Sequence, residues 1–120
     1  MKPINKSKII IATGGTGGHI FPAYSLAKNF IKNNYLVEIV TDKRGLQYLD
    51  KHKDIKFILN NSATIFKKNI ISLFLSIFII FYSYIKSLVI LYRARPKLVF
   101  GMGGHASFPV CIAAKTLNIP

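Results

Sequence analysis

Four short runs of apolar residues, rich in β-branched side chains, recur along the chain between longer segments of mixed character. They cover residues 9–12, 36–41, 55–59 and 98–100. Runs of this length in which most positions are apolar are typical of strands covered on both faces, as in a parallel sheet. Glycine or a polar residue follows each run and ends it. The pattern therefore predicts four buried strands.

Segments with a helical period lie between these runs. After the first run, apolar residues share one face of a helix that ends at residues 33–34. Residues 46–49 are expected to form a short helix or turn. Residues 65–94 contain neither glycine nor proline, and this length favours a helix that Pro96 closes. The last helix is predicted to start with Ser107 as its cap and to run to about residue 117.

Strands that alternate with helices at this spacing predict an α/β fold. We expect a Rossmann-like parallel sheet with right-handed crossovers and flanking helices. Residues 118–120 have the character of a loop that enters a further strand, so the predicted sheet is incomplete. Residues 1–120 are accordingly expected to form one domain, the amino-terminal portion of a larger protein.

Two glycine-rich loops follow the first and fourth predicted strands, and each precedes a helix. They are Gly14-Gly15-Thr16-Gly17-Gly18-His19 and Gly101-Met102-Gly103-Gly104-His105. Backbone N–H groups in such loops can converge on an anion, and a helix N-terminus adds partial positive charge. Since the carboxyl ends of parallel strands share one edge, both loops should face one crevice and bind a phosphate or diphosphate. The plain alternative is that these glycines only permit tight turns.

A histidine ends each glycine loop. His19 lies where the first loop becomes a helix, so its ring would border the anion site as a general base or a hydrogen-bond donor. A structural histidine that makes one capping bond is the alternative. His105 has the same relative position in the second loop. Asp42, after the second strand, resembles the ribose-binding acid of dinucleotide sites, although such aspartates more often cap turns.

Composition narrows the class of protein without selecting a ligand. Hydrophobic residues make up 51% of the 120 residues, which excludes intrinsic disorder, and a single cysteine fits a reduced, cytosolic setting. Seventeen Lys and Arg against four Asp and Glu give a formal net charge of +13, which favours phosphates, anionic lipid or nucleic acid. The basic residues are scattered, which disfavours nucleic acid, and no metal-ligand spacing or P-loop occurs.

An uncharged stretch, Asn69–Ile85, covers seventeen residues and would measure about 25 Å as a helix, slightly short of a bilayer core. Serines gather on one side of this helix. Aromatic and aliphatic side chains gather on the other, namely Phe74, Phe78, Phe81 and Ile85. Because basic residues flank the stretch, this apolar face is predicted to dock on an anionic membrane surface. A membrane-spanning helix and ordinary core packing are the alternatives.

Both loops, with the residues after them, closely resemble the MurG family of bacterial N-acetylglucosaminyltransferases. The similar segments continue as Ile20-Phe21-Pro22-Ala23 and as Ala106-Ser107-Phe108-Pro109, and the resemblance covers essentially the whole chain. Members of this family convert lipid I to lipid II in peptidoglycan synthesis at the cytoplasmic side of the inner membrane. The resemblance implies the acceptor-side, amino-terminal domain of a GT-B glycosyltransferase, without the carboxyl-terminal donor domain.

The resemblance also implies roles for residues. His19 would be the base that activates the acceptor sugar's 4-hydroxyl for direct, inverting displacement of UDP. UDP-GlcNAc and undecaprenyl-diphosphate-linked lipid I would contact the two loops, at Gly14, Gly15, Thr16, Gly17, Gly18, Gly103, Gly104 and His105. The family usually has Tyr where His105 stands. No metal or other cofactor is implied, and the apolar stripe corresponds to the patch by which these enzymes dock on the inner leaflet.

A second hypothesis belongs to a different class of protein. The chain would be a non-catalytic membrane adaptor that recruits a separate donor-binding chain, as in the split glycosyltransferases of dolichol-linked sugar synthesis. In both hypotheses the 120 residues alone would not complete a catalytic cycle.

Overall fold

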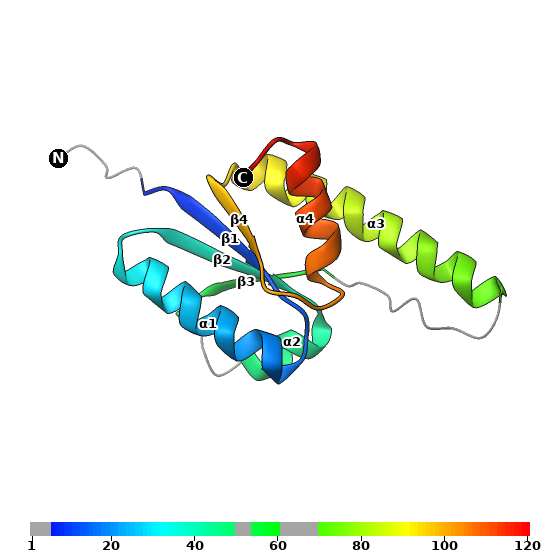
Figure 1. The fold of residues 1–120 in the computed structure, drawn as a ribbon, viewed down its shortest axis with the longest axis horizontal. Coiled ribbons are helices and arrows are strands. Elements are labelled where there is room, and N and C mark those ends of the chain that lie inside the picture. The colour runs from blue at the N-terminus through cyan, green and yellow to red at the C-terminus, as the bar shows by residue number, and fades with distance from the viewer. Residues whose placement is uncertain (1–5, 50–53, 61–69) are drawn as a thin grey trace.

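The computed structural model describes residues 6–49, 54–60 and 70–120. These residues form a parallel sheet with helices on both faces (Figure 1). The beginning of the predicted long helix, residues 65–69, lies outside the described residues. Asn69, the first residue of the uncharged stretch, falls in this part.

Within the described residues four strands form the sheet, in the order β3-β2-β1-β4, and every neighbouring pair is parallel. The strands are β1 (Lys8–Ala12), β2 (Leu36–Thr41), β3 (Lys56–Leu59) and β4 (Leu98–Gly101). Each begins and ends within one residue of its predicted bounds. The predicted α/β, Rossmann-like parallel sheet with flanking helices is therefore confirmed.

Helices cover the two faces of the sheet. They are α1 (Gly17–Lys32), α2 (Lys43–Leu49), α3 (Ile70–Ala94) and α4 (Ser107–Thr116). In Figure 1, α1 and α2 lie on one side of the strands and α3 and α4 on the other. The prediction that Ser107 caps α4 is wrong by one residue, because Ala106 is the N-cap. The Ser107 hydroxyl instead donates to the carbonyl oxygen of Gly104 at 2.8 Å, which holds the second glycine loop.

Alternate residues of β1 point into two separate cores, which explains why this strand is apolar at successive positions. Ile9 and Ile11 pack with Ala23 and Ala27 of α1. Ile10 and Ala12 pack on the opposite face, with Leu91 of α3 and Val110 and Ala113 of α4. Both faces of the central strands are thus buried.

Asn60 joins α3 to the sheet. Its side chain is 1% exposed, and its Nδ2 donates to Ser87 Oγ at 2.7 Å and to the carbonyl oxygen of Ser83 at 3.3 Å. Its backbone N–H donates to the carbonyl oxygen of Thr41 at 2.8 Å, at the end of β2. Ser76 is buried as well. The serine side of α3 therefore faces inward.

Candidate functional site

The strand order reverses beside β1. The chain passes from β1 to β2 and β3 on one side and then returns to β4 on the other side of β1. Loops that leave two such strands diverge to opposite faces of the sheet, and open α/β sheets bind ligands at this point. The two predicted glycine loops begin here, since α1 follows β1 and α4 follows β4. We call residues 14–19 and 101–105 the glycine-loop site.

The two loops touch each other through their backbones. The N–H of Gly14 donates to the carbonyl oxygen of Gly103 at 2.9 Å. A Cβ atom added to Gly104 would lie 2.6 Å from Gly14 Cα, which is closer than unbonded carbon atoms approach. Gly103 and Gly104 also have φ values of +101° and +83°, in the region that glycine adopts readily. The loops therefore lie together, as predicted, and only glycine fits where they meet.

The start of α1 presents backbone donors without partners. Four successive N–H groups, those of residues 15–18, have no acceptor among the described residues. The first N–H groups of any helix lack an internal acceptor, and the helix dipole adds partial positive charge there. The N–H of Gly14, in contrast, is already bonded to the second loop. Residues 15–18 thus offer the donors that an anion needs.

The ring of His19 lies against the second loop. His19 is the third residue of α1, it is half-buried, and its Cε1 and Nδ1 lie 3.2 and 3.3 Å from where a Cβ of Gly103 would stand. Its imidazole makes no hydrogen bond with any residue that the structure describes. The capping bond of the structural alternative is therefore not found in this part of the chain. As far as the described residues go, the ring nitrogens are available to a ligand.

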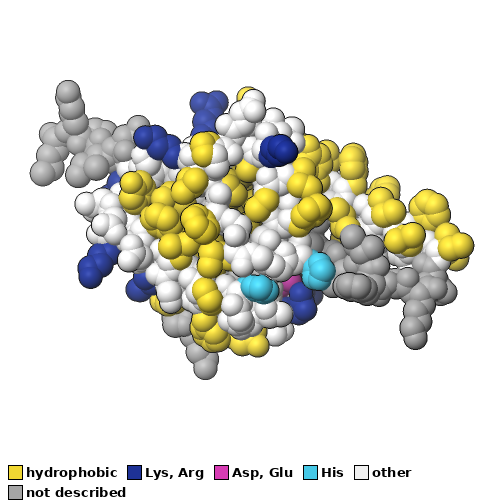
Figure 2. Space-filling view, viewed as in Figure 1, with side chains coloured by type: hydrophobic (Ala, Val, Ile, Leu, Met, Phe, Trp, Pro, Cys, Tyr) yellow, Lys and Arg dark blue, Asp and Glu magenta, His cyan; other side chains and the backbone are white. Residues whose placement is uncertain are grey.

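His105 follows Gly104 directly and is exposed. Figure 2 shows histidine side chains at the surface on the face in view, with acidic and basic side chains close by. The ring of His105 is accessible to a ligand at the glycine-loop site.

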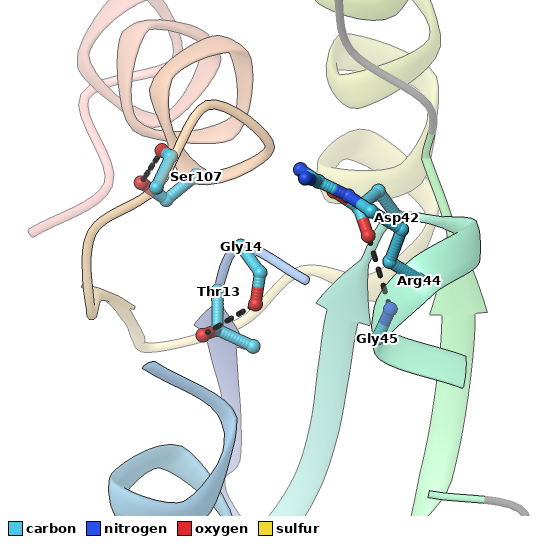
Figure 3. A network of polar contacts seen from close by, with 7 residues as sticks. Thr13, Gly14, Asp42, Arg44, Gly45 and Ser107 are labelled. Carbon is cyan, nitrogen blue, oxygen red and sulfur yellow. Dashed lines mark hydrogen bonds and ion pairs between the residues drawn. The ribbon is translucent and has the colours of Figure 1, made fainter. Parts of the chain in front are cut away.

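Asp42 and Arg44 form the wall beside the first loop. Asp42 Oδ1 accepts from the N–H of Gly45 at 3.0 Å, so this aspartate caps α2 and the ribose-binding interpretation is not needed to explain it. Asp42 Oδ2 accepts from Arg44 Nη2 at 3.1 Å (Figure 3). Sequence analysis did not identify Arg44, because it belongs to no recognisable motif. The one sequence feature that could have indicated this wall is the position of Asp42 three residues before Gly45, which is the spacing of a helix N-cap.

The outer side of α3 presents apolar side chains to solvent. Phe74, Phe78 and Phe81 are 68%, 73% and 60% exposed, and Ile85 is 43% exposed. The alternative that this stripe packs in the core is thus wrong for the described residues. By length and composition α3 could cross a membrane. However, β3 precedes α3 in the chain and β4 follows it, and both strands belong to one sheet, so a spanning helix would separate them.

Neither a metal centre nor a cysteine nucleophile is indicated among the described residues. In the ranges that the structure describes, no group of three or more His, Cys, Asp or Glu side chains could hold a metal ion. Cys111 lies in α4, and burial raises the pKa of its thiol, which disfavours a thiolate nucleophile.

Residues 9–120 match the glycosyltransferase family 28 N-terminal domain. Two curated relatives share the name UDP-N-acetylglucosamine–N-acetylmuramyl-(pentapeptide) pyrophosphoryl-undecaprenol N-acetylglucosamine transferase. The protein from the Wolbachia of Brugia malayi is 41% identical over 112 residues, which cover 93% of this chain and 30% of that protein. The Rickettsia prowazekii protein is 35% identical over 113 residues, covering 94% of this chain and 28% of that protein. The chain thus spans under a third of these relatives.

Solved structures show the same fold. MurG from Acinetobacter baumannii superposes with a TM-score of 0.78 at 23% identity, over 95% of this chain and 34% of that one. A glycosyltransferase from Rickettsia africae superposes with a TM-score of 0.66 at 21% identity, over 93% of this chain and 27% of that one. At these identities the likeness supports the architecture alone.

Proposed function

Because this chain belongs to the glycosyltransferase family 28 N-terminal domain family, we propose that it is the acceptor-side domain of an enzyme that makes lipid II. The enzyme would transfer N-acetylglucosamine from UDP-N-acetylglucosamine to the 4-hydroxyl of the N-acetylmuramic acid in undecaprenyl-diphosphate-linked lipid I. One observation carries the proposal. Two glycine loops meet at the point where the strand order reverses, beside helix N–H groups and an imidazole that have no hydrogen-bond partner among the described residues.

His19 acts as the general base in this proposal. The half-buried ring removes the proton from the acceptor's 4-hydroxyl while the hydroxyl oxygen forms a bond to the anomeric carbon of the donor sugar. The bond from that carbon to UDP breaks, UDP leaves with the electron pair, and the configuration of the carbon inverts. The contact of the His19 ring with the second loop supports this role, because a base there would lie beside both loops that are proposed to bind the substrates.

The backbone of the glycine-loop site binds the charged part of the substrates. The N–H groups of Gly15, Thr16, Gly17 and Gly18 would donate to a diphosphate at the start of α1. Gly14, Gly103 and Gly104 allow the second loop to approach, and the exposed His105 would contact a substrate from that loop.

The outer face of α3 docks the domain on the membrane. Phe74, Phe78, Phe81 and Ile85 would enter the interfacial region of the inner membrane at its cytoplasmic side. The formal net charge of +13 would strengthen this binding where the lipids are anionic. Docking of this kind would bring the glycine-loop site to a substrate whose lipid part stays in the bilayer.

A transfer assay tests the proposed function. A polypeptide that joins this domain to a carboxyl-terminal donor domain is mixed with labelled UDP-N-acetylglucosamine and vesicles that contain lipid I. We expect labelled lipid II, and a folded protein that forms none would overturn the proposal. The adaptor hypothesis predicts a different result, in which label is transferred only after a separate donor-binding chain is added and is recruited to the vesicles.

A further inference from the structure

The buried carboxylate of Asp42 accepts a hydrogen bond from the Arg44 guanidinium and so restrains it on one side. The side chain of Asp42 is 8% exposed, and each of its oxygens has a partner. Oδ1 accepts from the N–H of Gly45 at 3.0 Å, and Oδ2 accepts from Arg44 Nη2 at 3.1 Å. The carboxylate is thereby held by the first turn of α2. A guanidinium bonded to a fixed carboxylate loses much of the freedom that an exposed arginine normally has.

This ion pair lies directly against the first glycine loop. A Cβ atom on Gly15 would overlap Asp42 Oδ1 and would lie 2.6 Å from Arg44 Cβ. In Figure 3 the Arg44 side chain leaves α2 and its guanidinium points toward the space between Gly14 of the first loop and Ser107, the first residue of α4. Glycine at position 15 therefore allows the loop to pass along an arginine, next to the N–H groups of residues 15–18, which have no acceptor in the described part of the chain.

Most of the donors of Arg44 have no partner among the described residues. A guanidinium has five N–H donors, and the bond to Asp42 Oδ2 uses one nitrogen. The side chain is 60% exposed. Two other carboxylates in the described residues, those of Glu38 and Asp54, pair with lysines elsewhere on the fold. In the part of the chain that the structure describes, no second carboxylate pairs with Arg44.

We propose that Arg44 is a ligand-binding residue that donates to the diphosphate bound at the start of α1, and that Asp42 positions it. The inference rests on the proposed function, because it identifies a further contact at the same site. Backbone N–H groups supply donors there without a full charge, whereas a guanidinium supplies a charge and bonds two phosphate oxygens at once. The diphosphate belongs to the nucleotide sugar or to the lipid-linked acceptor, which share this chemistry.

Pyrophosphate binding to the whole chain tests the role of Arg44. Binding is measured by calorimetry at low ionic strength for the natural protein, Arg44→Gln, Arg44→Lys and Lys43→Gln. Lys43 is the matched control, because it is exposed on the same helix and its substitution removes the same charge. We expect the dissociation constant to rise about 10-fold or more for Arg44→Gln, about 3-fold for Arg44→Lys and less than 2-fold for Lys43→Gln.

Equal weakening by Arg44→Gln and Lys43→Gln would overturn the proposal, because it would show that only the overall charge matters. No weakening by Arg44→Gln would overturn it too, while the proposed function would stand on the transfer assay. If the natural chain does not bind pyrophosphate, the proposal fails and the transfer assay still tests the function separately. If circular dichroism shows that Arg44→Gln is unfolded, the dissociation constants of Arg44→Lys and Lys43→Gln are compared instead. Because Arg44→Lys keeps the charge, weaker binding by Arg44→Lys than by Lys43→Gln supports the proposal, and equal or tighter binding overturns it.

Steady-state kinetics of the two-domain enzyme distinguish the source of the diphosphate. With Arg44→Gln, a KM that rises for UDP-N-acetylglucosamine alone assigns the contact to the donor. A KM that rises for lipid I alone assigns it to the acceptor. Unchanged values of both KM would overturn the proposal for the working enzyme even if free pyrophosphate binds.

Discussion

Replacing Gly104 with alanine tests the contact between the two loops. The residue has a φ of +83°, and its added Cβ would lie 2.6 Å from Gly14 Cα and 3.0 Å from Gly14 N. The obstructing atoms belong to the backbone of the first loop, so rotation of a side chain cannot relieve the overlap. One loop must move away from the other.

The magnitude follows from two costs. A left-handed backbone costs an alanine about 1–2 kcal/mol relative to glycine. Inserting a methyl group where no space exists costs about 1–3 kcal/mol more. The free energy of unfolding should therefore fall by about 2–5 kcal/mol. At about 4 °C of Tm per kcal/mol for a domain of this size, Tm should fall by about 8–20 °C.

Thermal unfolding followed by circular dichroism measures this change, with Gly18→Ala as the matched control. Gly18 is the second residue of α1, and no heavy atom lies within 4 Å of its added Cβ. Alanine in a helix is favoured over glycine by about 0.5–1 kcal/mol, so this control should leave Tm unchanged or raise it by a few degrees. The reasoning is refuted if Gly104→Ala is as stable as the natural protein, or if Gly18→Ala loses as much stability.

Further predictions concern the imidazole, the outer face of α3 and the buried amide. His19→Ala in the two-domain enzyme should lower kcat about 10²–10⁴-fold and change the KM for UDP-N-acetylglucosamine little, because the ring serves as base. Replacing Phe74, Phe78 and Phe81 together with serine should abolish co-sedimentation with anionic vesicles, because interfacial binding scales with the apolar area inserted. Asn60→Ala should lower the free energy of unfolding in urea by about 1–3 kcal/mol, because it removes two buried hydrogen bonds.

Each of these predictions has a control. For kcat the comparison variant is His105→Ala, which removes a proposed substrate contact and should raise KM more than it lowers kcat. Near-natural turnover of His19→Ala would remove that residue from the base role. For vesicle binding the control is a triple serine variant at exposed aromatics outside α3, namely Phe21, Tyr35 and Tyr48. Unchanged sedimentation of the α3 variant would point to another anchor. For Asn60 the control is Gln47→Ala, an exposed amide on α2, and an equal loss of stability in both would contradict the role of the Asn60 bonds.

The strands and the meeting of the loops could be predicted from the sequence because each depends on local chemistry. In the first run, successive apolar residues indicate a strand that is buried on both faces. Ile10 and Ile11 are indeed fully buried, on opposite faces of the sheet. Gly103 and Gly104 mark a turn that other residues cannot form. Parallel strands then bring their carboxyl ends to one edge whatever the residues between them.

The side of the site that Arg44 forms could not be predicted, because it depends on contacts between distant segments. The pattern around Asp42 identifies a polar end of a strand, but it does not reveal that Gly15 lies against this end. That neighbourhood arises only from the pairing of β1 with β2. Ser107 shows the same limit, since its hydroxyl bonds to Gly104 of the preceding loop rather than to the helix that follows it.

The polarity of α3 is opposite to that of an ordinary surface helix. Ser76, Ser83 and Ser87 are buried, while Phe74 and Phe78 on the other side are exposed. Burial of a phenylalanine side chain would stabilise the protein by about 1.5–3 kcal/mol, and each exposed phenylalanine lacks this contribution. Exposure to water therefore does not explain why the aromatic side of α3 faces outward. An apolar neighbour does explain it, because it recovers that free energy on binding. The small serines contribute from the other side, since Ser87 Oγ and the carbonyl oxygen of Ser83 accept from Asn60, which directly follows β3, while Leu91 of the same helix packs into the core.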